Sequence, residues 1–280
     1  MIGQDVQKME VNLRFGDPAL LPPQEYLAPE PDDCSSCADP CTDHKQFPSS
    51  LYIDQVIPML GSVDAYARHI IIATGLSNWP PRILKEKNTV AYSLYHAGRR
   101  RGSSGWNNMI SNSSLVSYYS TVPDSCDVII YPDNIIVSNV TCDTADDFYD
   151  LFLSTDLPKE PLDIELINKD DRLVEMKVQK NPYRTMMLLC SHGRVDKRCG
   201  VTAPILAYEL DQVLREKNLD EHDAGILMVS HIGGHQITGN VICYIDEEET
   251  IIQGKIIKDL YRGAMDKSFK NQVGRSMLRW

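Results

Sequence analysis

The chain has 280 residues, of which 42% are hydrophobic and 24% charged, and its formal net charge is −11. These values predict a globular protein of one large or two ordinary domains, and no apolar run approaches the ~20 residues that a membrane-spanning helix needs. The acidic balance argues against nucleic-acid binding, because phosphate contacts need a basic face, and it favours a partner that carries a basic patch.

The first 48 residues are rich in proline and acidic side chains, which predicts an extended leader. Cys34, Cys37, Cys41 and His44 lie within eleven residues of this leader. Three interpretations remain open for them: a second metal site that holds zinc, a dithiol of Cys34 and Cys37, and free thiols in a flexible segment.

Residues 49–157 are predicted to form a first α/β domain. The apolar run 69–73 reads as a strand, and the runs 128–131 and 135–137 flank a turn and read as a hairpin. The apolar spacing that follows predicts a helix over 145–153.

Residues 158–182 are polar and are predicted to be a linker, after which residues 183–280 form a second domain. In this domain the apolar residues of 203–217 follow a helical period. We expect Thr202 to cap that helix and Pro204 to lie in its first turn.

The second domain contains two pairs of potential metal ligands. Cys190 and Cys199 are spaced C-x8-C, and His231 and His235 are spaced H-x3-H. Each pair follows a short apolar run that predicts a buried strand, so both ligand loops would leave the ends of strands. Two thiolates and two imidazoles form a metal-ligand set, and the spacing differs from that of a zinc finger. Zinc and a [2Fe–2S] cluster, in which two histidines can replace cysteines, both remain open.

The residues around these ligands allow a simpler interpretation as well. Cys190 taken alone is typical of a buried small hydrophobe, and His231 taken alone is typical of a structural histidine. Four ligands on matching strand–loop units favour the metal site. Lys197 and Arg198, between the two cysteines, would offset the negative charge of bound thiolates.

Several motifs resemble the sucrase/ferredoxin-like family over about residues 184–263. They are CSHGRVDKRCG (190–200), APILAYEL (203–210), HIGGH (231–235) and GNVICY (239–244). The tail GKIIKDLYRG (254–263) is most similar to the fungal "altered inheritance of mitochondria" branch of this family. The resemblance implies a thioredoxin-like ferredoxin domain at the C-terminus and a [2Fe–2S] cluster held by Cys190, Cys199, His231 and His235.

The sequence departs from the family in one place. The resemblance implies a further strand and a connecting segment after Tyr244, whereas only six residues separate Tyr244 from Ile251 here. We therefore expect an α/β protein whose ferredoxin domain lacks one strand beside the site.

The function expected on these grounds is electron transfer, or redox sensing in thiol homeostasis, by a carrier rather than by an enzyme with its own substrate. The alternatives are a structural zinc-binding interaction protein and a thiol oxidoreductase that uses Cys34 and Cys37. Expected partners are a redox protein, a second copy of the chain and the iron–sulfur assembly machinery, since the terminal Trp280 resembles a recruitment tail. The expected location is the mitochondrion or the cytoplasm: the family branch favours the mitochondrion, whereas the lack of a recognisable presequence and the terminal Trp280 favour the cytoplasm.

Overall fold

A computed structural model of the chain describes residues 45, 47–52, 66–102, 108–155, 162–221, 223–233 and 238–245, and the backbone of 277–278. Among these residues the strands form a single nine-stranded sheet with few helices. The protein is therefore α/β, as the sequence predicted.

The first part of the sheet combines a parallel β-α-β unit with an antiparallel hairpin. The unit consists of β1 (Arg68–Ala73), α2 (Val90–Arg100) and β2 (Asn108–Ser113), and the hairpin consists of β3 (Cys126–Tyr131) and β4 (Ile135–Val140). The connection between β1 and α2 includes η3 (Ile83–Lys85), and β4 is followed by α3 (Ala145–Phe148) and the π-helical η4 (Tyr149–Leu153). The predicted strand, hairpin and helix of this region are all present.

The segment predicted as a linker carries structure of its own. It contains α4 (Ile164–Ile167), η5 (Asp171–Leu173) and β5 (Lys177–Lys180), and β5 pairs antiparallel with β4 at the edge of the sheet. Met176 and Val178 are buried in the core of the first part, which explains why a mostly polar segment folds onto it. The domain limits at 49–157 and 183–280 stay predictions.

The second part of the sheet repeats the plan of the first. β6 (Thr185–Cys190), α5 (Lys197–Glu216) and β7 (Gly225–Val229) form a parallel β-α-β unit, and β8 (Val241–Ile245) runs antiparallel to β6. The order of the whole sheet is β5-β4-β3-β1-β2-β7-β6-β8-β9, where β9 is Met277–Leu278. Strands β3-β1-β2 thus correspond to β8-β6-β7 in order and direction.

The two parts join where β2 and β7 meet antiparallel, with Ser113 opposite Val229. The contacts on either side of this pair are symmetric. The Ser114 hydroxyl oxygen accepts a hydrogen bond from the Met228 amide at 3.0 Å, and the Ser230 hydroxyl oxygen accepts one from the Asn112 amide at 3.0 Å. We therefore describe residues 66–180 as the first half of the molecule and residues 181–245 as the second half.

The sequence analysis expected one strand to be missing after Tyr244, which lies in β8 near the edge of the sheet. β9 occupies that edge and runs parallel to β8, with Met277 opposite Ile242. β4, which holds the equivalent position beside β3, pairs antiparallel with β3. Residues 277–278 thus occupy the sheet edge beside β8, in the opposite direction to that of β4 beside β3.

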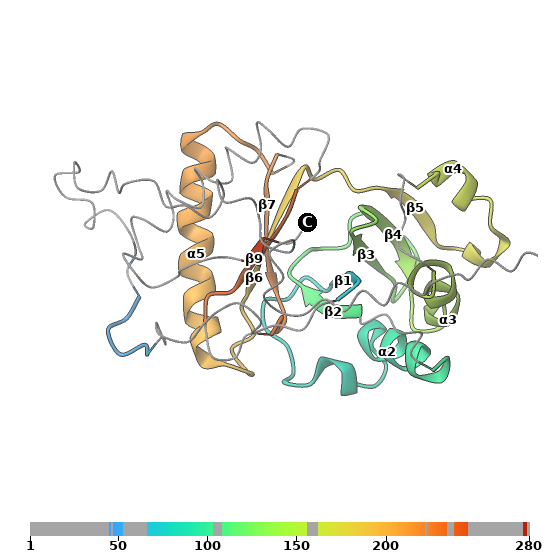
Figure 1. Cartoon of the computed structure of the whole chain (residues 1–280), viewed down its shortest axis with the longest axis horizontal. Coiled ribbons are helices and arrows are strands. Elements are labelled where there is room, and N and C mark those ends of the chain that lie inside the picture. The colour runs from blue at the N-terminus through green and yellow to red at the C-terminus, as the bar shows by residue number, and fades with distance from the viewer. Residues whose placement is uncertain are drawn as a thin grey trace, which may run out of the picture.

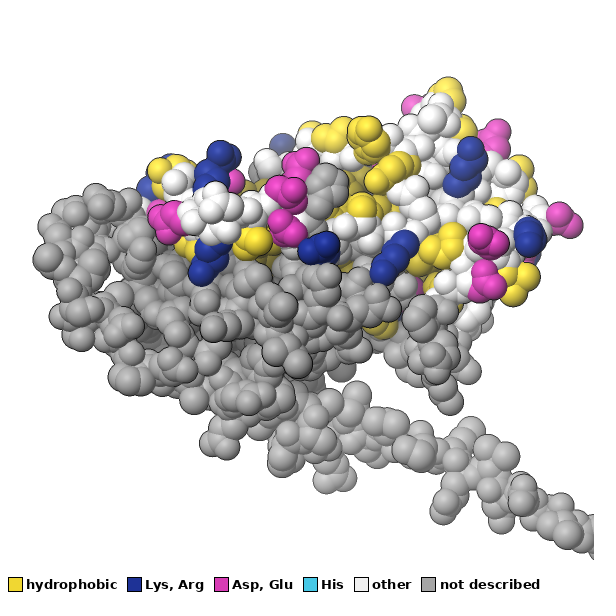
Figure 2. Space-filling view, turned by 90° about the horizontal axis from the view of Figure 1, so that it is seen from above, with side chains coloured by type: hydrophobic (Ala, Val, Ile, Leu, Met, Phe, Trp, Pro, Cys, Tyr) yellow, Lys and Arg dark blue, Asp and Glu magenta, His cyan; other side chains and the backbone are white. Residues whose placement is uncertain are grey.

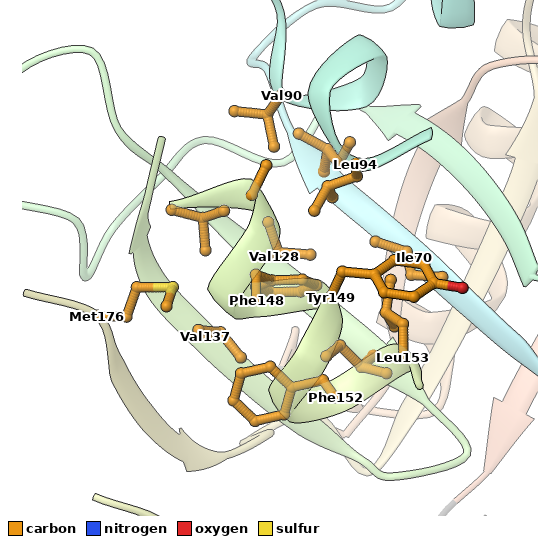
Figure 3. Close-up of a cluster of buried hydrophobic side chains, with 14 of the residues drawn as sticks. Ile70, Val90, Leu94, Val128, Val137, Phe148, Tyr149, Phe152, Leu153 and Met176 are labelled. Carbon is orange, nitrogen blue, oxygen red and sulfur yellow. The ribbon is translucent and has the colours of Figure 1, made fainter. Parts of the chain in front are cut away.

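Helices cover the outer faces of the two halves, with α5 on one side and α2 and α3 on the other (Figure 1). One core lies between the first half and its helices and is centred on Phe148, with Ile70, Leu94 and Val128 around it (Figure 3). A second core, which includes Leu189, lies between the second half and α5.

A third core lies between the inner faces of the two halves. It contains Ile71 and Ile129 from the first half and Leu188 from the second. The Tyr131 and Tyr244 rings stack across it with centroids 3.9 Å apart. Alternate residues of a strand point to opposite faces, so β6 supplies both the inner core and the α5 core and is apolar throughout.

The surface shown in Figure 2 carries Lys and Arg side chains interspersed with Asp and Glu, and hydrophobic side chains lie between them. Among the described residues, no helix is both long enough and apolar enough to cross a membrane.

Candidate metal centre

Both predicted ligand loops begin at the carboxyl ends of two neighbouring parallel strands, β6 and β7. β6 and β7 are parallel neighbours, and their last residues, Cys190 and Val229, lie opposite each other. His231 follows β7 by two residues, so the loop that carries it starts beside the loop that carries Cys190. This arrangement agrees with the expectation that the ligands emerge from strand ends.

The helix after Cys190 begins earlier than predicted. α5 starts at Lys197, and its N-cap is Asp196, whose side chain accepts a hydrogen bond from the Arg198 amide at 2.9 Å. The predictions of a Thr202 cap and of Pro204 in the first turn were wrong, because a side chain that accepts from a free helix amide sets the start before the apolar period begins. Cys199 therefore lies in the first turn of α5 and not in a loop.

The two cysteine sulfurs lie together in the inner core. Cys190 is 1% exposed and Cys199 is 3% exposed. The two thiols interact directly with each other, and the Cys199 sulfur accepts a hydrogen bond from the Thr238 hydroxyl at 3.5 Å. The two cysteines, nine residues apart in the sequence, thus come together because Cys190 ends β6 and Cys199 lies in the first turn of α5.

The hydrogen bonds around the sulfurs make the two thiols unequal. The bond from Cys190, together with those from Thr238 and the Gly239 amide, lowers the pKa of Cys199 to about 7. The same thiol contact and burial raise the pKa of Cys190 well above its usual value, although the amides of His192 and Ile232 oppose that rise. The site therefore favours one thiolate near neutral pH and surrounds both sulfurs with amide donors, as metal-bound thiolates require.

His231 is linked to the cysteine loop through its backbone. The His231 amide donates a hydrogen bond to Nδ1 of His192 at 3.2 Å. Burial lowers the pKa of His192, whose ring is 2% exposed and lies edge-on to Trp79. The sequence analysis did not single out His192, although its position two residues after Cys190 was a usable signal.

Other predicted ligands fall outside the described residues. These are His235, the cluster of Cys34, Cys37, Cys41 and His44, and the terminal Trp280. In the part of the chain that the structure describes, no group of three or more Cys, His, Asp and Glu side chains is arranged to hold a metal ion. The structure therefore brings Cys190 and Cys199 together and places His231 in the adjoining loop.

Of the two cations predicted to offset the charge of the thiolates, Arg198 is already paired with a carboxylate of its own loop. Arg198 forms an ion pair with Asp196 at 2.7 Å, and this contact raises the pKa of Arg198. The Arg198 guanidinium also donates to the Tyr52 carbonyl at 3.2 Å. Lys197 is exposed at the first position of α5.

The first half has no ligand side chain at the positions that correspond to Cys190 and His231. In the parallel pairs, Ala73 lies opposite Ser113 as Cys190 lies opposite Val229, and Ser113 and Val229 meet at the junction. Ala73 therefore corresponds to Cys190, and Leu115 corresponds to His231. The amide bonds agree with this correspondence, since Thr74 donates to Ser113 at 3.1 Å and Ser191 donates to Val229 at 3.0 Å.

Instead of ligands, the first half supplies a wall to the site. The Ser191 hydroxyl donates to the Ser77 carbonyl at 2.6 Å, and the Arg194 amide donates to the Asn78 side-chain oxygen at 3.3 Å. These contacts join loops that are more than a hundred residues apart, so no local sequence signal could have indicated them.

Comparison with known proteins places the chain in a family. A family model described as sucrase/ferredoxin-like matches residues 59–279. The chain therefore belongs to the sucrase/ferredoxin-like family. No solved structure matches it.

Three relatives illustrate the similarity. The chain is 24% identical over 253 residues to "Altered inheritance of mitochondria protein 32" of Meyerozyma guilliermondii, which covers 86% of this chain and 87% of that protein. It is 31% identical over 188 residues to the protein of the same name of Debaryomyces hansenii, and the aligned region covers 55% of this chain and 65% of that protein. It is 26% identical over 242 residues to "Actin patches distal protein 1" of Saccharomyces cerevisiae, and the aligned region covers 78% of this chain and 74% of that protein.

Proposed function

We propose that this protein binds a [2Fe–2S] cluster and works as an electron carrier or a redox sensor. The observation that carries the proposal is the contact between the buried sulfurs of Cys190 and Cys199, at the strand edge from which the loop of His231 also leaves. The family description as ferredoxin-like supports the same conclusion.

The donor set fits such a cluster. Cys190 and Cys199 would supply two sulfur ligands, and His231 and His235 would supply two nitrogen ligands from one short loop. A bound [2Fe–2S] cluster accepts and releases one electron, and imidazole ligands raise its reduction potential relative to an all-cysteine site. The amides beside the sulfurs would offset negative charge on the thiolates.

The protein's own residues hold the sulfurs and exclude water. A side chain on Gly200 would place a Cβ atom 3.1 Å from the Cα atom of Gly193, so glycine at both positions lets the first turn of α5 lie directly against the cysteine loop. The inner core covers the pair from the side of the first half. Burial of this kind favours electron exchange with a docked protein over reaction with solvent.

The proposed partner is accordingly another redox protein. Binding of the iron–sulfur assembly machinery through Trp280 and homodimerisation are further proposals that rest on the family resemblance. The names of the relatives support a role connected with mitochondria, and we propose the mitochondrion or the cytoplasm as the location.

The test is anaerobic purification followed by iron, sulfide and zinc analysis and a visible spectrum. We expect about two irons and two sulfides per chain, and loss of both in Cys199→Ala. Cys243→Ala is the matched control, because Cys243 is also buried but lies in the α5 core. This control should keep its iron.

Two results would replace the proposal. One zinc per chain without sulfide would assign the protein to the structural zinc class. Absence of metal, combined with thiol–disulfide exchange that Cys34→Ser abolishes, would assign it to the thiol oxidoreductases.

A further inference from the structure

A chain of hydrogen bonds runs from the first half to the histidine loop. The Thr74 hydroxyl donates to the Ser113 carbonyl at 2.7 Å and accepts from the Trp79 indole at 2.9 Å. The Trp79 carbonyl lies 2.9 Å from Nε2 of His192, and Nδ1 of His192 lies 3.2 Å from the His231 amide nitrogen. The chain of bonds thus runs from the end of β2 through segment 74–79 to the cysteine loop and on to His231.

The surroundings of His192 fix the orientation of its ring. Nε2 faces two carbonyl oxygens, those of Trp79 and of Pro80 at 3.1 Å. A carbonyl oxygen can only accept, so Nε2 carries the hydrogen and Nδ1 is the acceptor for the His231 amide. Both Trp79 and His192 are 2% exposed, so neither side chain has room to turn.

The loop that carries His192 is anchored on both sides. Ser191 is bound to the Ser77 carbonyl and Arg194 to the Asn78 side chain, as described above. Segment 74–80 of the first half, which we call the clamp segment, therefore holds the cysteine loop at three successive points. His192 is the residue that extends this hold to the backbone of His231.

We propose that His192 is a positioning residue that fixes the backbone of His231, and that the clamp segment of the first half is thereby part of the metal site. What is positioned rests on the proposed function, since His231 is a ligand only if the cluster is bound. Fixing the amide of His231 restricts the directions in which the imidazole of the same residue can point. The ligand-free half thus acts as the support of the ligand-bearing half.

The test uses three variants of the full chain. His192→Phe keeps the ring volume and removes both polar atoms. His192→Gln keeps one donor and one acceptor on a planar group, so it should restore what His192→Phe loses. His69→Phe is the matched control, because His69 is also fully buried and hydrogen-bonded, to Tyr244 and Ser111.

The first measurement is amide exchange of His231, resolved by NMR in metal-free protein. In His192→Phe we expect exchange about tenfold or more faster, because a buried donor loses its acceptor. His192→Gln and His69→Phe should stay within about twofold of the unchanged protein. Equal exchange in folded His192→Phe and unchanged protein would overturn the proposal.

The second measurement is the electron paramagnetic resonance spectrum of the reduced, iron-loaded protein. His192→Phe should shift the g values and lose iron faster, whereas His192→Gln and His69→Phe should match the unchanged protein. If neither the unchanged protein nor any variant holds iron, the proposed function is wrong. Amide exchange still tests the role of His192 in that case.

Thr74→Val extends the test to the clamp segment and avoids the case in which His192→Phe does not fold. It removes the hydroxyl that anchors the Trp79 indole and lies outside the ligand loops. We expect faster His231 exchange in the same direction as in His192→Phe, by a smaller factor. Exchange unchanged in Thr74→Val would remove the clamp segment from the site.

Discussion

The sulfur of Cys199 is surrounded by donors at the residue scale. A thiol, a hydroxyl and an amide all point hydrogens at it, and this lowers its pKa to about 7. Only the thiolate binds a metal ion, so a thiol that ionises near neutral pH competes better for metal than one that is merely buried. Cys243 provides the contrast, because burial alone raises the pKa of its thiol to about 12.

The histidine ligands should control the potential of the proposed cluster. In His231→Cys a thiolate replaces a neutral imidazole, and the added negative charge stabilises the oxidised state. We expect the midpoint potential to fall, on the order of 100 mV, and its dependence on pH to flatten, because imidazole can exchange a proton near neutral pH. Potentiometric titration between pH 6 and pH 9 measures both effects.

A conservative change in the same loop serves as the control for that experiment. Ile232→Val removes one methylene group and leaves the ligand charge unaltered, so its potential should match that of the unchanged protein. A His231→Cys protein that keeps its cluster and its original potential would argue against histidine ligation.

At the scale of elements, the arginines at the end of α2 connect it to the next helical segment. Arg101 forms ion pairs with Asp146 in α3 and Asp150 in η4, and Arg100 binds Asp146 at 2.8 Å. The sequence analysis did not anticipate these partners, because they lie more than forty residues further along the chain. The contacts tie together the two helical elements that cover the outer face of the first half.

The charge state of this link predicts an acid-dependent stability. Hydrogen bonds from Arg100 and Arg101 lower the pKa of Asp146, and a hydrogen bond from Arg101 lowers that of Asp150. Their folded pKa values lie below the unfolded value of about 3.9. The stabilisation is therefore present above that pH and is lost as the pH falls through the folded values.

Arg101→Gln should lower the melting temperature at pH 7 by about 1–4 °C, since the pairs are largely exposed. The difference from the unchanged protein should shrink below about pH 4 as both carboxylates become protonated. Arg215→Gln is the control, because the ion pair of Arg215 with the partly exposed Asp211 lies within α5. Thermal melts across this pH range that show a constant difference for Arg101→Gln would contradict the prediction.

At the scale of the whole molecule, the two halves share a core and not merely a surface. The inner faces of the two halves of the sheet bury apolar side chains against each other, and the Tyr244 hydroxyl lies 2.9 Å from Nδ1 of His69 across the same region. Each half also has a core beneath its own helices, but the inner face of each is buried against the other half. We therefore expect the halves to unfold together.

Leu188→Ala tests this expectation from inside the shared core. Leu188 is fully buried, so the change should lower the free energy of unfolding by about 2–5 kcal/mol. Amide exchange in urea should show β1 and β6 opening with the same loss of protection. Leu166→Ala, at a leucine that is 65% exposed, should cost less than about 0.5 kcal/mol.

A different pattern would separate the halves. Protection that falls in β6 and stays constant in β1 would mean that the second half unfolds as an independent domain. The sequence-based division at residues 158–182 would then describe the folding units better than the shared core does.

Much of the fold was readable from local patterns. The runs that became β1, β3, β4 and β6 are apolar because these strands are buried on both faces, and in β7 one face is buried and the other partly buried. Turn residues between β3 and β4 indicated their hairpin. The α/β class and the emergence of ligand loops at strand ends follow from these elements alone, since strand, helix and strand in succession favour a parallel unit.

The limits of the helices and the segment before Asn181 were less predictable. The start of α5 depends on a capping contact of Asp196, and a period of apolar residues cannot register that contact. β5 has only four residues, and its pairing with β4 depends on an open sheet edge some forty residues earlier. Non-local pairing of this kind leaves little trace in a short polar sequence.

For the proposed site, the sequence by itself determined the types and spacing of the four candidate ligands, Cys190, Cys199, His231 and His235. Only the tertiary structure decided that the two sulfurs touch, that Thr238 donates to one of them and that His192 joins the two loops. It also decided that a half without ligands closes the site through the clamp segment. The physical reason is that the sequence specifies the chemical type of each residue, whereas contacts between distant loops form only when strands from both halves align in one sheet.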